Sequence, residues 1–162
     1  MSSTAQAAAA QATPAAVVLD TNAALDWLVF DDPAIRGLST AISQGSVRWL
    51  ACPRMRLELA HMLSHASLAR WRPDAAAALA TFDRHVRLLD EPLANTPKRL
   101  FCTDPDDQVF IDLALEHQAL WLVTHDRALL KLARKALLRG VKVLPPARWQ
   151  MPNSTVLAGE NG

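Results

Sequence analysis

Two acidic residues each follow a short apolar run, a position that suits a metal ligand. Asp20 comes directly after residues 16–19 (Ala-Val-Val-Leu), and Asp126 closes Val-Thr-His-Asp at residues 123–126. Carboxylates crowded together repel one another, and a hard divalent cation such as Mg²⁺ or Mn²⁺, which prefers oxygen ligands, relieves that repulsion. Such a centre activates water and stabilises the charge that develops when a phosphodiester is attacked in line.

These carboxylates need a scaffold that brings them together. The pattern predicts strands at residues 16–19, 47–52, 120–124 and 141–144, and helices at residues 23–28, 33–43, 53–68, 74–86, 106–118 and 126–139. Strands that alternate with helices predict a three-layer α/β/α domain with a mainly parallel sheet. Because parallel strands end at the same edge of a sheet, we expect Asp20 and Asp126 to lie at one edge.

Glu58 is a third candidate because of its place on the predicted helix 53–68. It flanks the apolar stripe formed by Met55, Leu59 and Met62 rather than lying opposite it. A carboxylate in that position is costly unless it is paired or binds a metal. The alternative interpretation is an ion pair with Arg54, four residues earlier.

Asp104 and Asp107 lie where the predicted helix 106–118 begins. Asp107 shares a helical face with Phe110 and Ile111, which should point its carboxylate toward the sheet. Acids in a first turn also cap free N–H groups and complement the helix dipole. Capping is the preferred interpretation for Asp104, and for Asp107 both roles stay open.

The length and composition of the chain indicate its domain organisation and its class. The chain has 162 residues and a net charge of +1, which indicates one domain and does not by itself indicate a nucleic-acid partner. We expect a disordered tail at residues 1–15 rather than a signal peptide, a domain at residues 16–150, and a flexible tail at residues 151–162. Two cysteines and the absence of a long apolar run favour a cytoplasmic protein that does not enter the membrane.

The ordered motifs of the chain resemble those of PIN-domain proteins. The matching pieces are Leu-Asp-Thr-Asn at residues 19–22, Leu-Glu-Leu at 57–59, Asp-Pro-Asp-Asp at 104–107 and Val-Thr-His-Asp at 123–126. The likeness is strongest to bacterial PIN proteins described as toxins of toxin–antitoxin pairs. By this resemblance, the catalytic, metal-binding acids are Asp20, Glu58, Asp107 and Asp126, with Asp104 as the other choice for the third acid. Asn22 and Thr124 match the polar residues that support them.

The resemblance implies an Mg²⁺- or Mn²⁺-dependent ribonuclease that acts on RNA and is often a homodimer. VapC-type toxins of this family are held inactive by a small antitoxin protein. The chain departs from the family at residues 87–101, which match nothing in the pattern. It also has Thr103 before Asp-Pro, where that subgroup often has Arg, so the substrate contact of that Arg is not implied here.

Other interpretations of the same residues stay open. A PIN-fold module could bind RNA or a protein without cutting. A phosphatase with Asp20 as nucleophile is disfavoured, because the haloacid-dehalogenase pattern needs a second Asp where this chain has Asn22. His125 is either a solvated loop residue or a contact for a substrate phosphate.

Overall fold

The fold is built on one five-stranded parallel sheet. The structure is a computed structural model, and it describes residues 13–94 and 99–152. The strands are β1 (Ala15–Leu19), β2 (Val47–Ala51), β3 (Val86–Leu88), β4 (Trp121–Val123) and β5 (Lys142–Leu144), in the order β3-β2-β1-β4-β5. Every neighbouring pair is parallel.

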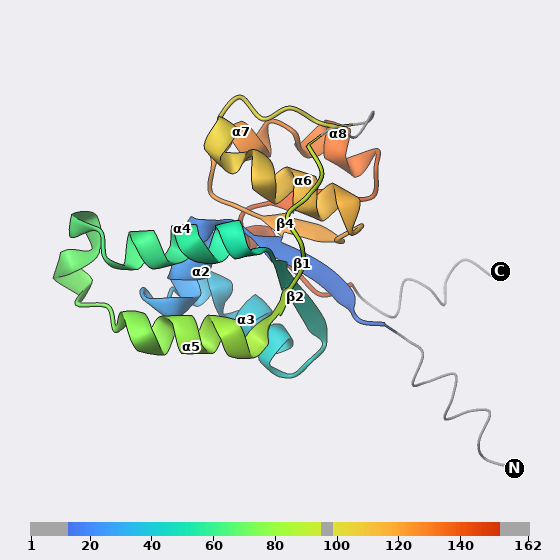
Figure 1. The fold of residues 1–162 in the computed structure, drawn as a ribbon. Coiled ribbons are helices and arrows are strands. Elements are labelled where there is room, and N and C mark those ends of the chain that lie inside the picture. The colour runs from blue at the N-terminus through green and yellow to red at the C-terminus, as the bar shows by residue number, and fades with distance from the viewer. Residues whose placement is uncertain (1–12, 95–98, 153–162) are drawn as a thin grey trace, which may run out of the picture.

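Helices cover both faces of this sheet. The α-helices are α2 (Thr21–Leu28), α3 (Arg36–Ser43), α4 (Pro53–Leu63), α5 (Ala75–His85), α6 (Gln108–Glu116), α7 (Arg127–Leu130) and α8 (Ala133–Leu137). The 3-10 turns are η1 (Pro33–Ile35), η2 (Ala66–Trp71), η3 (Pro105–Asp107) and η4 (Pro146–Arg148). Figure 1 shows α2 to α5 on one side of the sheet and α6 to α8 on the other. The expected three-layer α/β/α architecture is therefore confirmed.

The strand order places a topological switch point between β1 and β4. The chain leaves β1 toward β2 and leaves β4 toward β5, in opposite directions across the sheet. Leu19 at the end of β1 pairs with Val123 at the end of β4, and the Asp20 N–H donates to the Val123 carbonyl at 3.1 Å. In open α/β sheets, ligands bind beyond the strand ends at such a point. This is the edge at which the sequence places Asp20 and Asp126.

A continuous core holds this edge in place. The buried residues of β1, β2 and β4 are all apolar, and Trp49 of β2 and Trp121 of β4 are among the largest buried side chains. Phe110 and Ile111 of α6 are buried in the same core. Because these groups pack the sheet from both faces, the loops after β1 and β4 start from rigid positions.

Three of the predicted elements needed correction. The helix predicted to reach residue 86 ends at His85, and residues 86–88 form the edge strand β3, because Trp49 and Val86 come into register only when the chain folds back beside β2. The helix predicted to reach residue 68 ends at Leu63, and the His65 side chain instead accepts from the Ser67 N–H to begin η2. The helix predicted at 126–139 is divided into α7 and α8 by a turn at residues 131–132.

The expected tails fall largely outside the described residues, as residues 1–12 and 153–162 do. Ala15, the last residue of the expected N-terminal tail, is the first residue of β1. Within the ranges that the structure describes, no helix has the length and apolar character needed to cross a membrane.

Candidate metal centre

Asp20 lies at the floor of the site, directly after β1, and is 3% exposed. One carboxylate oxygen accepts from the Ala23 N–H at 2.7 Å and so caps α2. The other oxygen accepts from the Thr124 hydroxyl and, at 3.2 Å, from the His125 backbone N–H. Burial raises the pKa of Asp20, and these hydrogen bonds counteract the rise only in part. Asp20 is thus a buried acid held by neutral donors.

Thr124 connects the two carboxylates that follow the strands. It is completely buried, and its hydroxyl donates to Asp20 while it accepts from the Asp126 backbone N–H at 2.9 Å. Asp126 in turn caps α7, because its carboxylate accepts from the Ala128 N–H at 2.9 Å. The strand ends therefore fix both acids through one hydroxyl.

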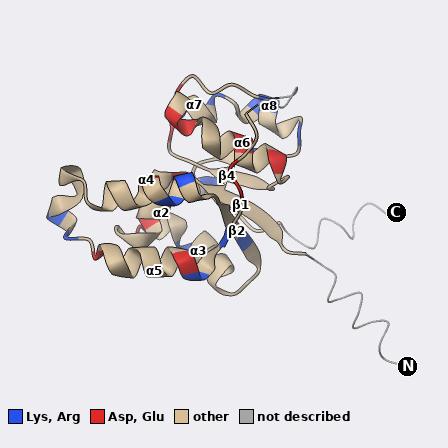
Figure 2. Cartoon of the chain, viewed as in Figure 1, with Lys and Arg blue, Asp and Glu red and all other residues tan. Residues whose placement is uncertain are grey.

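Three carboxylates converge at the mouth of the site. Asp104, Asp107 and Asp126 each present an oxygen atom, and these atoms all lie within 4.8 Å of one another. Asp104 also accepts from the Asp106 N–H at 3.0 Å and caps η3, so its capping role and its place in the cluster coexist. Asp107 begins α6 without a capping hydrogen bond from its side chain. Figure 2 shows acidic residues where this helix begins.

Glu58 faces the same cleft from the opposite helix layer. The cleft holds about 490 Å³ and is lined by Thr21, Asn22, Glu58, Met62, Asp104, Asp107, His125, Asp126 and Arg127. Burial raises the pKa of Glu58, the Thr21 hydroxyl lowers it, and the nearby charges of Asp106 and Asp20 raise it further. Asn22, the expected supporting residue, is exposed on this lining. Of the expected acids, Asp107 and Asp126 lie together with Asp104, and Glu58 lines the same cleft outside this group. Asp20 and Thr124 are buried behind the cleft rather than on its lining.

The acids of the cleft form no ion pairs with the residues that the structure describes. Among the residues that the structure describes, none of Glu58, Asp104, Asp107 and Asp126 forms an ion pair within 4.0 Å. The proposed pair between Glu58 and Arg54 is therefore absent, although the Arg54 charge lowers the pKa of Glu58 from a distance. A set of oxygen donors with uncompensated negative charge fits a hard divalent cation.

Comparison with known proteins agrees with this geometry. A family model described as a PIN domain matches residues 16–128, which is more than half of the chain. The chain belongs to the PIN-domain family. Among solved structures, the crystal structure of VapBC2 from Rickettsia felis bound to a DNA fragment from their promoter matches it with a TM-score of 0.53. That match is 14% identical and covers 79% of this chain and 96% of the other, and it supports the fold alone. The curated proteins gave no significant match.

This PIN domain also holds a polar pair that sequence reasoning missed. Asp26 of α2 is 8% exposed, and its carboxylate contacts the His125 ring nitrogen Nε2. His125 also lines the cleft, and its contact with Asp26 fixes this loop residue against α2. The signal in the sequence was a lone acid within the apolar helix at residues 23–28, which calls for a buried partner.

Proposed function

We propose that this PIN-domain protein is a metal-dependent endoribonuclease that hydrolyses RNA phosphodiester bonds. The observation that carries the proposal is the convergence of Asp104, Asp107 and Asp126 at the switch point of the sheet, where none of them is in an ion pair with another described residue. Fixed carboxylates of this kind lose repulsion when a divalent cation binds. Mg²⁺ and Mn²⁺ fit the oxygen-only donor set.

Asp107, Asp126, Asp20 and Glu58 would hold the metal, and Asp104, which lies beside Asp107 and Asp126, would support them. A bound divalent cation would supply Lewis-acid stabilisation of the phosphate and would lower the pKa of the attacking water. Thr124 and the His125 N–H keep the Asp20 carboxylate oriented, and the Ala128 N–H does the same for Asp126. Asn22, on the cleft lining, is placed to bind substrate or a water that the metal orders.

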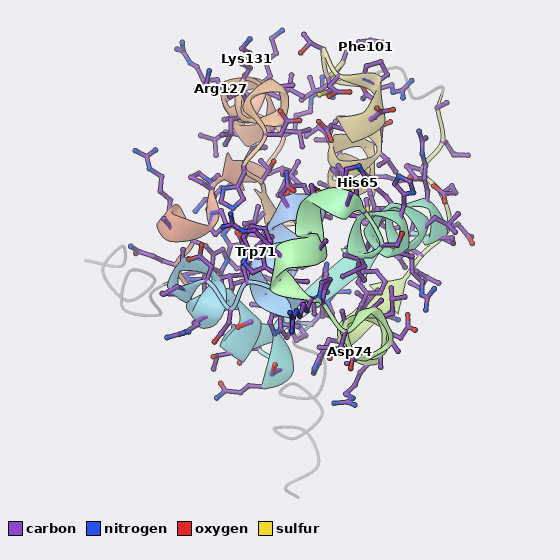
Figure 3. The ribbon with its side chains drawn as sticks, turned by 90° about the vertical axis from the view of Figure 1, so that its left-hand side faces the viewer. His65, Trp71, Asp74, Phe101, Arg127 and Lys131 are labelled. Carbon is purple, nitrogen blue, oxygen red and sulfur yellow. The ribbon has the colours of Figure 1, made fainter. Side chains whose placement is uncertain are left out.

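Arg127 gives the cleft one cationic group on its lining. Figure 3 shows Arg127 of α7 and Lys131, which directly follows this helix, at the same end of the molecule. A guanidinium there would bind a phosphate of the RNA backbone beside the metal. The resulting arrangement attracts cations at the acids and phosphates at the rim.

The proposal extends to partners and cellular context. The protein would be the toxin of a toxin–antitoxin pair, it would act in the cytoplasm as a homodimer, and a separate antitoxin protein would block its cleft. This extension rests on the family and on the resemblance of the four motifs to toxin PIN proteins, and one similar solved structure is of VapBC2 from Rickettsia felis. The domain proper would be residues 16–150, with residues 1–15 and 151–162 as tails.

The proposal is tested by cleavage of a mixed, structured RNA by the purified protein with Mn²⁺, with EDTA, and with the variants Asp20→Asn and Glu58→Gln. We expect metal-dependent cutting that both variants lose. The melting temperature with and without Mn²⁺ is measured in parallel, because a ligand that binds only the folded state raises it.

The outcomes separate the activity from the site. Full activity of Glu58→Gln would remove Glu58 from the catalytic set. A wild-type protein that Mn²⁺ stabilises but that cuts no RNA would keep the metal centre and reject the RNA substrate. A protein that neither cuts nor responds to metal would instead be a non-catalytic binding module.

A further inference from the structure

A second hollow adjoins the acidic cleft, and it has a different character. It holds about 500 Å³ and is lined by Arg54, Glu91, Pro92, Ala94, Arg99, Phe101, Cys102, Pro105, Gln108, Val109 and Asp112. Arg54 acts electrostatically on Glu58 of the cleft, and the charges of Asp126 and Asp104 raise the pKa of Cys102. The two hollows are therefore neighbours around η3. We call the second one the Phe101 pocket.

Most polar side chains of the Phe101 pocket are hydrogen-bonded within the protein. Arg99 donates to Asp112 at 2.8 Å, and the Gln108 amide donates to the same carboxylate at 2.9 Å. Glu91 accepts from the Arg54 backbone N–H at 2.7 Å and from the Cys52 thiol at 3.2 Å. The pocket is thus preformed and near neutral, which suits an uncharged, flat, partly polar group better than a phosphate or a metal ion.

Phe101 supplies an open aromatic surface beside that pocket. It is 73% exposed, and the Arg99 guanidinium, held by Asp112, lies 5.6 Å from the centre of its ring. Figure 3 shows Phe101 at the end of the molecule from which Arg127 and Lys131 also extend. Exposing a large aromatic ring to water costs free energy, and a ligand stacked on the ring would remove that cost.

Arg54 is the cationic group of this pocket without a fixed carboxylate partner. Within the described ranges, its guanidinium is in no ion pair shorter than 4.0 Å, whereas Arg99 is paired with Asp112. It lies at the start of α4, where Figure 2 shows basic residues. A phosphate that links a base in the pocket to the next nucleotide in the cleft would find this guanidinium between them.

We propose that the Phe101 pocket binds an unpaired base of single-stranded RNA adjacent to the phosphodiester that is cut. Phe101 would stack on the base, and Arg54 would contact its phosphate. The inference rests on the proposed function and adds a base-binding subsite beside the acidic cleft. Base–aromatic stacking tolerates any base, so the pocket selects single strands over duplexes rather than one sequence.

The test measures binding of fluorescein-labelled single-stranded RNA by anisotropy, in a background of Asp107→Asn so that the RNA stays intact. Phe101→Ala should weaken binding about tenfold, the scale of one stacked base, and Phe101→Trp should retain it. Leu138→Ala is the matched control, because Leu138 is a 90% exposed apolar side chain that lines neither the Phe101 pocket nor the acidic cleft, and its loss should change nothing. Arg54→Gln should reduce the slope of log affinity against log salt concentration by about one, which is the change expected when one phosphate contact is lost.

An RNA that lacks one base separates a stacking site from a general effect. Removing the base at one position should weaken binding to the parent protein and should not weaken it further in Phe101→Ala. Equal affinities of the parent and Phe101→Ala, or equal losses in both with the abasic RNA, would overturn the inference. Absence of RNA binding by every protein would overturn it too. Metal-dependent cutting by the wild-type protein, measured separately, then decides whether the proposed function stands without this pocket.

Discussion

The acidic cleft and the Phe101 pocket handle carboxylates in opposite ways. In the pocket, the Arg99 guanidinium compensates the charge of Asp112 in an ion pair of 2.8 Å. In the cleft, the carboxylates of Asp104, Asp107 and Asp126 approach one another, and no described side chain pairs with them as a cation. Both regions meet at η3, so paired and unpaired carboxylates lie within a few residues of each other.

This difference shows which region is suited to bind a cation. An acid that is paired internally already has its charge compensated and leaves little for a cation to do. An acid that is held in place only by neutral donors keeps a charge that a cation can bind, and this uncompensated charge lowers the stability of the metal-free protein. The cleft is therefore the place where binding of a cation should change both stability and activity.

The largest expected effect comes from Asp107→Asn. Asp107 is in the group of three acids and makes no capping hydrogen bond through its side chain, so the change removes charge with little structural loss. We expect RNA cleavage to fall by more than about 100-fold, beyond the range typical of residues that only orient a ligand. Cleavage rates with Mn²⁺ measure this.

The melting temperature is the control for that variant. Without metal, Asp107→Asn should melt no lower than the wild type, because repulsion among the acids is reduced. With Mn²⁺, it should gain less than the wild type. A variant that lost activity and also melted well below the wild type in EDTA would mean that Asp107 is structural, as a helix-start acid can be.

The next effect is that of Thr124→Val, which removes a neutral donor from the cleft and adds no charge. Asp20 loses the hydroxyl that orients it, and the Asp126 N–H loses its acceptor. Positioning groups of this kind typically contribute ten- to a hundredfold to metal affinity or activity. Titration of Mn²⁺ against the melting temperature should show weaker binding in Thr124→Val, and Thr124→Ser should restore it. A failure of Ser to restore binding would assign the loss to packing.

The sequence predicted the cleft better than the pocket, for a physical reason. Asp20 and Asp126 follow buried strands, and strand periodicity and a terminal acid are local signals that fix the edge of the sheet. The pairs of the pocket join residues far apart in the chain, as Glu91 does with Cys52, and no local pattern encodes them. The edge strand β3 was missed for the same reason. It is short, and its residues Arg87 and Leu88 are exposed, so only its pairing with β2 identifies it.

Within the pocket, Asp112→Ala should affect stability and leave the metal response intact. The change leaves the buried amide of Gln108 without one of its acceptors, which costs about 1–3 kcal/mol for a buried group. Unfolding by urea measures the loss. Asp83→Ala is the matched control, since the pair of Asp83 with Arg56 is exposed and should contribute little. The contrast between pocket and cleft would fail if Asp112→Ala reduced the gain in melting temperature on adding Mn²⁺.

The smallest expected effect is in the pH dependence of stability. The pKa of Asp20 is raised by burial, and that of Glu58 is raised by burial and by nearby acids. The folded state therefore holds these protons more tightly than the unfolded state, whose carboxyl pKa is about 4. The stability of the metal-free protein should fall as the pH rises from that value through the raised pKa values, and Mn²⁺ should stabilise more as the pH rises. Melting temperatures in EDTA and in Mn²⁺ across this range measure both trends. Glu58→Gln should make the melting temperature in EDTA less dependent on pH, because its amide does not titrate. An unchanged pH dependence in this variant would exclude Glu58 from the acids whose charge the metal compensates.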